Sequence, residues 1–192
     1  MTTTSGASTP ADLSVDEILD ALARGATSPL STGVSLTQLD HALQTAALLA
    51  HQHPGDTELA VAGLVHDVGH MLPGGSDETH ADDAARAVGR ALGPRVAGIV
   101  ALHVEAKRYL VATESAYGSV LAGDSVESLR RQGGAMGEAE AAAFLGRPWA
   151  RDAVTLRRAD DGAKVDGIEV RDLGQWVSTL RQLSGLPGGA GA

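Results

Sequence analysis

Residues 59–70 read LAVAGLVHDVGH, a short apolar segment that ends in charged and imidazole side chains. Small and apolar residues fill its first half, which is typical of a helix buried on most sides. The ionisable pair His66-Asp67 follows directly. Burying a carboxylate without a counter-charge is costly, and a metal ion removes that cost because both side chains then stay deprotonated. The segment therefore favours a metal site, with a buried His–Asp hydrogen bond as the alternative.

The other histidines support a cluster rather than isolated core residues. His51 and His53 lie beside a proline, and we interpret them as solvated residues at a helix end. The remaining five lie in apolar helices or at helix starts: His41, His66, His70, His80 and His103. Adjacent residues on a helix point roughly 100° apart. His66 is therefore predicted to bind one metal ion while Asp67, with two oxygens, bridges it to a second.

A helical period extends from this segment in both directions. Ser14 followed by Glu17 predicts a capped helix to about residue 24, and Ser35 followed by Gln38 repeats that pattern before an apolar stripe. Residues 71–79 are predicted to form a loop, and only 167–170 carry a weak strand signal. The other predicted helices cover residues 59–70, 80–92, 95–109, 117–131, 138–144, 150–164 and 172–183. The prediction is an all-α helical bundle.

Length and composition limit the class of protein. With 192 residues the chain is long enough for one domain. We expect a disordered leader at 1–11, a domain at 12–184 and a flexible tail at 185–192. The leader lacks the basic and apolar regions of a signal peptide, and no run approaches the about 18 apolar residues that span a bilayer. We therefore expect a cytoplasmic protein without a membrane partner.

Charge and cysteine content narrow the partners and cofactors. The 15 basic and 24 acidic residues give a net charge of −9, which argues against nucleic acid but leaves room for a small anionic substrate in a locally basic pocket. The absence of cysteine excludes disulfides, zinc fingers and iron–sulfur clusters. Imidazole and carboxylate ligands favour iron, manganese or zinc.

The order of these ligands resembles that of the HD-domain superfamily. The narrower similarity is to its mixed-valent di-iron oxygenases, the organophosphonate-cleaving PhnZ-like enzymes, and it covers about residues 36–164. Residues 103–110 (HVEAKRYL) and 128–134 (SLRRQGG) are the most specific part of it. The other matching segments are Gln38-x-x-His41, His66-Asp67-x-Gly69-His70, Ser125-x-x-Ser128 and 156–164 (LRRADDGAK).

The resemblance implies a single HD-domain bundle that binds two iron ions, Fe(II) and Fe(III), and uses dioxygen as co-substrate. Asp160 is preferred over Asp161 because of its four-residue spacing to Lys164. The implied metal ligands are His41, His66, Asp67, His80, His103 and Asp160, with Asp67 bridging. The implied substrate-binding residues are His70, Lys107, Ser125, Ser128, Gln132 and Arg157, of which His70 and Lys107 are also catalytic candidates.

The two cations fit this assignment on chemical grounds. Lys107 lies four residues after His103, and Arg157 lies three before Asp160, so each shares a helix face with a ligand. Cations repel a metal site unless an anion lies between them, and a phosphonate would supply one. The alternative is that both are surface charges on amphipathic helices. Ser near a helix start is commonly a cap, which is the alternative for Ser125 and Ser128.

The implied reaction is oxidative cleavage of the C–P bond of a 1-hydroxyalkylphosphonate, of the 1-hydroxy-2-amino- or trimethylammonio-ethyl type, to phosphate and a carboxylic acid. The relatives that act on the aminoethyl substrate carry a Tyr and a Glu where this chain has Ser31 and Val34. Asp40, Glu105 and Asp124 are the candidates to replace that carboxylate. A metal-dependent phosphohydrolase is the alternative activity, and a sensing module would predict an incomplete ligand set. The sequence does not indicate an oligomeric state.

Overall fold

The computed structural model describes residues 12–30, 35–121 and 123–185, without the side chains of Val120, Gly123 and Asp124. These residues form helices and short 3₁₀ turns without a β-strand, and one isolated bridge joins Pro29 to Thr37. The all-α prediction is confirmed. The α-helices are α1 (Val15–Arg24), α2 (Gln38–Gln52), α3 (Thr57–Val65), α4 (His80–Leu92), α5 (Pro94–Thr113), α6 (Tyr117–Val120), α7 (Gly123–Arg131), α8 (Glu138–Leu145), α9 (Ala150–Gly162) and α10 (Val177–Ser184). The 3₁₀ turns are η1 (Gly25–Thr27), η2 (Val68–Met71) and η3 (Leu173–Trp176).

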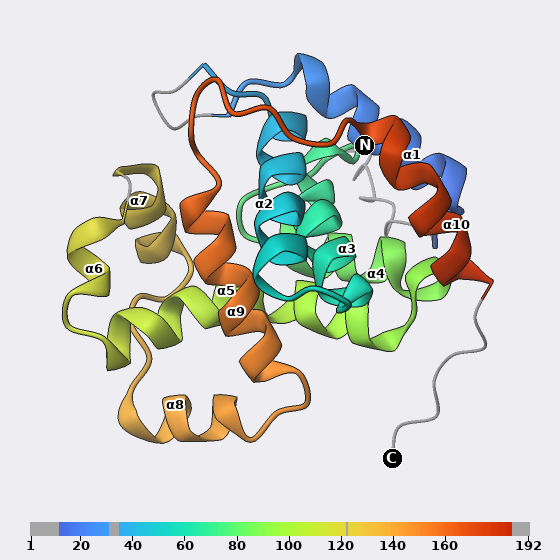
Figure 1. Ribbon diagram of the computed structural model, residues 1–192. Helices are drawn as coiled ribbons and strands as arrows, with labels where there is room; N and C mark the ends of the chain where they lie inside the picture. The colour runs from blue at the N-terminus through green and yellow to red at the C-terminus, as the bar shows by residue number, and fades with distance from the viewer. Residues whose placement is uncertain (1–11, 31–34, 122, 186–192) are drawn as a thin grey trace, which may run out of the picture.

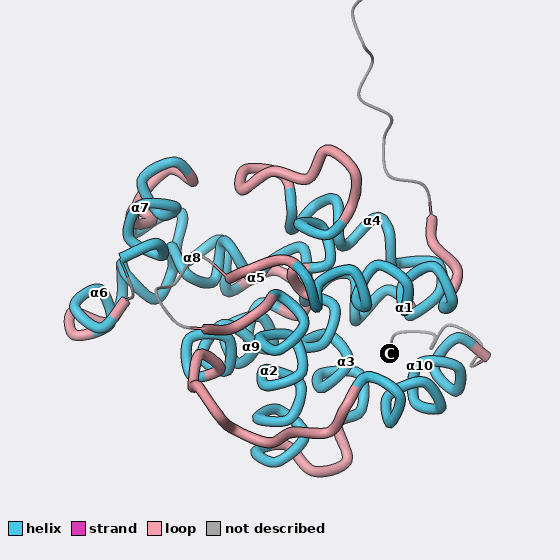
Figure 2. Tube along the Cα trace, turned by 90° about the horizontal axis from the view of Figure 1, so that it is seen from above, coloured by secondary structure: helices cyan, strands magenta, loops and turns pink. Residues whose placement is uncertain are grey.

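Helices α2, α3, α5 and α9 form the centre of the molecule (Figure 1). Helix α2 packs against α3, while α5 packs against both α4 and α9. Both views place α1 and α10 at one end and α6, α7 and α8 at the other (Figures 1 and 2). The larger hydrophobic core lies among α1–α5, α9 and α10, and a smaller one lies among α5, α8 and α9. Because α5 and α9 contribute to both cores, they join the two ends.

A glycine allows α2 and α3 to approach closely. A Cβ atom at Gly63 would lie 2.6 Å from Cδ1 of Leu49 and 3.3 Å from the backbone nitrogen of Ala46. Interiors are packed too densely to absorb such an atom without a shift. This contact holds the end of α3 beside the middle of α2.

The predicted start of α2 was wrong by two residues. Thr37, not Ser35, is the N-cap: the Asp40 backbone N–H donates to Thr37 Oγ1 over 3.1 Å. The carboxylate of Asp40 accepts from the Thr37 backbone N–H at 2.9 Å and so completes a capping box. The two patterns overlap in sequence, and the charged carboxylate of Asp40, which also accepts from the Thr37 hydroxyl over 2.7 Å, is a stronger acceptor than a Gln amide. By contrast, the predicted box of Ser14 and Glu17 is confirmed at α1.

Other boundaries also differ from the prediction. The helix predicted over 59–70 ends at Val65 and is followed by η2, the helix over 117–131 is two helices, and that over 172–183 begins with η3. The weak strand signal at 167–170 was wrong because no strand among the described residues pairs with this segment, and Ile168 is exposed. The prediction for His53 is confirmed, since it ends α2 and is exposed.

Several predictions concern residues outside this description. They include the leader at 1–11, the tail beyond Gly185, and Ser31 and Val34. The boundaries of the domain at 12–184 therefore stay a prediction. Among the helices that the structure describes, none has the length and apolar character needed to cross a bilayer.

Candidate metal centre

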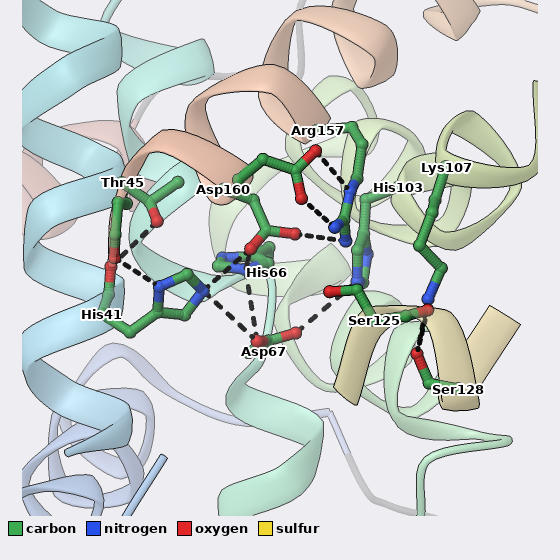
Figure 3. Close-up of polar contacts among 12 residues, drawn as sticks. His41, Thr45, His66, Asp67, His103, Lys107, Ser125, Ser128, Arg157 and Asp160 are labelled. Atoms are coloured by element: carbon green, nitrogen blue, oxygen red, sulfur yellow. Dashed lines mark hydrogen bonds and ion pairs between the residues drawn. The ribbon is translucent and has the colours of Figure 1, made fainter. Parts of the chain in front are cut away.

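All six residues predicted as metal ligands lie together in the middle of the bundle, and Figure 3 labels all of them except His80. They come from different elements, and five of them are buried while Asp67 is largely buried. His41 lies in α2, His66 ends α3, Asp67 precedes η2, His80 begins α4, His103 lies in α5 and Asp160 lies in α9. Their convergence depends on the packing of these elements rather than on any local motif.

One oxygen of Asp67 faces a first group of donors. Oδ2 of Asp67 lies 3.7 Å from Nε2 of His41 and 3.3 Å from Nε2 of His66. The carboxylate of Asp160 completes this group, because its Oδ1 lies 3.0 Å from Nε2 of His41. The donor atoms of His41, His66 and Asp160 are close enough to share one ion. The first group thus offers two imidazoles and two carboxylate oxygens.

The other oxygen of Asp67 faces a second group. Oδ1 lies 3.6 Å from Nε2 of His80 and 3.5 Å from Nε2 of His103. The two Nε2 atoms are themselves 3.1 Å apart. The ring of His70 stacks on that of His80 with centroids 4.1 Å apart, and a ring nitrogen of His70 lies close enough to the donor atoms of Asp67 and His80 to share an ion with them. Asp67 therefore lies between two sets of donors, as a bridging carboxylate must.

Every imidazole of the cluster is oriented by a backbone carbonyl. The other ring nitrogen, Nδ1, lies within hydrogen-bond distance of a carbonyl oxygen in each case: 2.9 Å for His41 to Ala163, 2.8 Å for His66 to Gly63, 2.9 Å for His80 to Asp77 and 2.7 Å for His103 to Val100. A ring that donates from Nδ1 keeps a free lone pair on Nε2. Two such lone pairs face each other in the second group, and Nε2 of His66 is buried without a hydrogen-bond partner. The donor set fits metal ions.

The pKa values of the cluster agree with a site that binds a positively charged ion. Burial lowers the pKa of His103, and it lowers that of His80 to about 3. Burial also opposes protonation of His66, but the neighbouring charge of Asp67 raises its pKa to about 9. Although burial opposes their ionisation too, nearby cationic groups hold the pKa values of Asp67 and Asp160 well below the usual range. A proton and a metal ion therefore compete for the same nitrogen of His66.

A cavity of about 260 Å³ adjoins the cluster. Eleven of the twelve predicted site residues line it, and the exception is His66, which lies fully buried behind it. Lys107 and Arg157 are buried, so the alternative that they are surface charges is wrong. Ser125 and Ser128 lie within α7, facing Lys107, whose Nζ donates to Ser128 Oγ over 2.7 Å.

Three residues near Asp160 were not predicted to take part in the site: Tyr117, Asp161 and Lys164. Nη1 of Arg157 donates to Asp160 Oδ2 over 2.6 Å, and its Nη2 pairs with Asp161. The hydroxyl of Tyr117 donates to Asp161, and Lys164 Nζ lies 3.3 Å from Asp160 Oδ1. The adjacent acidic pair at 160–161 was the available signal, but Asp161 was weighed only as a metal ligand and not as a partner of Arg157.

The backbone of Asp77 is a second unpredicted feature. Its carbonyl oxygen lies 2.9 Å from Nδ1 of His80 and accepts from Nε2 of Gln132 over 3.2 Å. Its carboxylate pairs with Arg131. The loop before α4 therefore connects a residue of the second group to α7. A backbone carbonyl carries no signal in the sequence, so this contact could not have been predicted from it.

Comparison with known proteins matches residues 39–160 to the HD-domain family model. The chain belongs to the HD-domain family. The match begins two residues before His41 and ends at Asp160, so it includes all six residues of the cluster.

Three relatives are similar to this chain, and the names of two of them narrow its assignment within the HD-domain family. A protein of Gimesia maris named hydroxymethylphosphonate dioxygenase is 40% identical over 151 residues, which cover 74% of this chain and 75% of the relative. A protein of Leisingera caerulea named [1-hydroxy-2-(trimethylamino)ethyl]phosphonate dioxygenase (glycine-betaine-forming) is 29% identical over 159 residues, 79% of this chain and 81% of the relative. The uncharacterised protein L432 of Acanthamoeba polyphaga mimivirus is 29% identical over 153 residues, 73% of this chain and 68% of the relative. The resemblance to the PhnZ-like HD oxygenases is confirmed.

Proposed function

We propose that this HD-domain protein is a mixed-valent di-iron oxygenase that cleaves the C–P bond of a 1-hydroxyalkylphosphonate. One dioxygen molecule is consumed: one oxygen atom enters the carboxylic acid and the other enters phosphate. The observation that carries the proposal is the position of Asp67, whose two oxygens face two separate sets of imidazoles. The names of two relatives, both phosphonate dioxygenases, support the same reaction.

The proposed ligands divide between two ions. His41, His66, Asp160 and Oδ2 of Asp67 would hold one iron ion, while His80, His103 and Oδ1 of Asp67 would hold the other. When bound, the iron pair supplies the redox chemistry with dioxygen and acts as a Lewis acid on the substrate hydroxyl. Without His70, which we assign to the substrate, the second group has fewer protein donors than the first, and it would leave more positions open to ligands from the cavity.

The remaining cavity residues would bind and orient the phosphonate. Lys107 and Arg157 bring positive charge, and Ser128 receives the Lys107 hydrogen bond, so its hydroxyl orientation is set. Ser125 and Gln132 offer further polar groups, and Oε1 of Gln132 is buried without a partner. His70, stacked on His80, adds a ring nitrogen at the edge of the second group. Together they would fix the hydroxylated carbon beside the second group and exclude bulk water.

The described lining favours a substrate without a cationic far group. A quaternary ammonium ion is usually held by an aromatic cage or a carboxylate. Outside the metal cluster, the two carboxylates among the described lining residues are Asp77 and Glu127, and both pair with Arg131. Apart from histidines, no aromatic ring lies in that lining. We therefore favour hydroxymethylphosphonate over the aminoethyl and trimethylammonioethyl substrates that the sequence suggested.

Two of the three carboxylates that the sequence suggested do not change this preference. Asp40 is used by the cap of α2, and Glu105 pairs with Arg147 over 2.6 Å. Neither lines the cavity. The side chain of Asp124 lies outside the described residues.

Phosphorus NMR of iron-loaded protein tests the proposal. Hydroxymethylphosphonate should give phosphate and formate when oxygen is admitted and stay intact without oxygen, and the two cationic hydroxyphosphonates should react more slowly. Protein stripped of iron by a chelator is the control. If oxygen leaves all three substrates intact while a phosphoester is cut anaerobically, the chain is a phosphohydrolase and not an oxygenase.

A further inference from the structure

The guanidinium of Arg157, at the wall of the cavity, is held by three neighbouring residues. Three of its five N–H groups have partners: Nη1 donates to Asp160 Oδ2 over 2.6 Å, Nη2 pairs with Asp161, and Nε donates to the Tyr117 hydroxyl over 3.2 Å. The guanidinium is buried and lines the cavity. Its remaining N–H groups are therefore available in one fixed orientation.

Tyr117 closes a ring of contacts with Asp161 and Arg157. Its hydroxyl accepts from Nε of Arg157 and donates to the same Asp161 carboxylate that Arg157 contacts. Burial, together with the adjacent charge of Asp161, raises the pKa of Tyr117 above its usual value. The phenol therefore keeps its proton and remains a donor to Asp161. A ring of this kind restricts the rotation of the guanidinium more than a single ion pair does.

The same contacts join two parts of the site. Tyr117 begins α6, just before the helix that carries Ser125 and Ser128, whereas Asp161 and Arg157 lie on α9 beside Asp160. Because Arg157 donates to Oδ2 of Asp160, it is the other oxygen, Oδ1, that faces Nε2 of His41. The orientation of Arg157 thus affects both the anion-binding side of the cavity and the carboxylate of the first group.

We propose that Tyr117 is a positioning residue: with Asp161 it holds the guanidinium of Arg157 in the orientation that binds an oxyanion of phosphorus in the cavity. The proposal builds on the phosphonate site of the proposed function. It concerns the shared chemistry of phosphonate and phosphate and does not depend on which reaction follows.

The chain supplies a matched control. It contains two tyrosines, and the second, Tyr109, packs its ring against Phe144 in the smaller core, with centroids 5.2 Å apart. Tyr117→Phe and Tyr109→Phe each remove one phenol oxygen. Only the first removes a contact with Arg157. Both variants are loaded with iron under anaerobic conditions, and calorimetry measures their affinity for inorganic phosphate while circular dichroism checks the fold.

Tyr117→Phe should weaken phosphate binding by about tenfold, the size expected for a hydrogen bond to a charged group, whereas Tyr109→Phe should bind as the wild type does. With hydroxymethylphosphonate the KM should rise by a similar factor and kcat should change little. Iron content should be unchanged, because Arg157 and Lys164 still contact Asp160. Equal phosphate affinity in both variants would overturn the proposal.

A double-mutant cycle with Arg157→Lys separates positioning from a general loss of stability. If Tyr117 acts through Arg157, Tyr117→Phe should have almost no further effect on phosphate binding in the Arg157→Lys background. The same tenfold loss in both backgrounds would overturn the proposal, and so would a wild-type protein that binds no phosphate. Turnover in the NMR experiment decides the oxygenase function separately.

Discussion

Asp67 is the residue on which both halves of the cluster depend. Its two oxygens contact opposite sets of imidazoles, and it lies just after α3 rather than within a helix. Asp67→Ala should abolish turnover and release most of the iron, because both ions lose a negatively charged ligand at once. Iron per chain, measured after gel filtration, checks this. Asp20→Ala, which removes an exposed carboxylate of α1, is the control, and near-normal iron in the Asp67 variant would mean that the bridge is elsewhere.

Lys107 should give substrate binding a dependence on pH. Burial first, and then the nearby positive charge of Arg157, lower the pKa of Lys107 to about 8. The ammonium form is present below this pKa and is lost as the pH rises through it. Since an anionic phosphonate is attracted to the charged form, the KM should rise above pH 8, approaching about tenfold per pH unit.

Lys107→Arg provides the comparison for this pH effect. A guanidinium remains protonated throughout this range, so the KM of the variant should be nearly constant between pH 7 and 9. Steady-state kinetics over that range, with the iron content checked at each pH, is the measurement. A parallel rise of KM in wild type and variant would assign the titration to another group.

At the scale of the elements, the close contact between η2 and the start of α4 brings His80 to Asp67. A Cβ atom at Gly69 would overlap the backbone carbonyl of His80. Gly69→Ala should therefore push the start of α4 away, with a loss of stability of about 2 kcal/mol and a lower iron content. Gly89→Ala lies in the same helix, where the new Cβ would meet Ala97 Cβ at an ordinary 3.5 Å. Urea denaturation should show that Gly89→Ala is as stable as the wild type. Equal stability of Gly69→Ala and Gly89→Ala would contradict the expectation.

At the scale of the whole molecule, the proposed metal ions connect most of the bundle. Their ligands come from α2, α3, α4, α5 and α9 and from the junction before η2. A ligand that binds only the folded state at a thousand times its Kd stabilises it by about 4 kcal/mol, and for a chain of this size that corresponds to about 10 °C in Tm. Iron-loaded protein should melt that much higher than chelator-treated protein. Asp67→Ala should show no such difference, and identical melting of wild type with and without iron would argue against a metal that spans the bundle.

The helical class could be predicted because local patterns encode it, whereas the full set of clustered residues was implied by the resemblance to the HD-domain family. Apolar periodicity indicates which face of a segment is buried, and a His–Asp pair at the end of an apolar segment favours a metal site, with a buried hydrogen bond as the alternative. The segments at 103–110 and 128–134 were specific enough to indicate the family. Boundaries were less accurate where two caps competed, as at Thr37, or where a helix tightened into a 3₁₀ turn, as after Val65.

The arrangement within the site depended on packing between distant segments. Periodicity determines that His41 and Asp160 lie on buried faces, but the relative position of α2 and α9 determines that their side chains meet. The same is true of Tyr117 and Asp161, which are 44 residues apart and carry no joint pattern. Local backbone preferences act over a few residues, whereas the two oxygens of Asp67 are assigned to their partners by five helices packed around a common core.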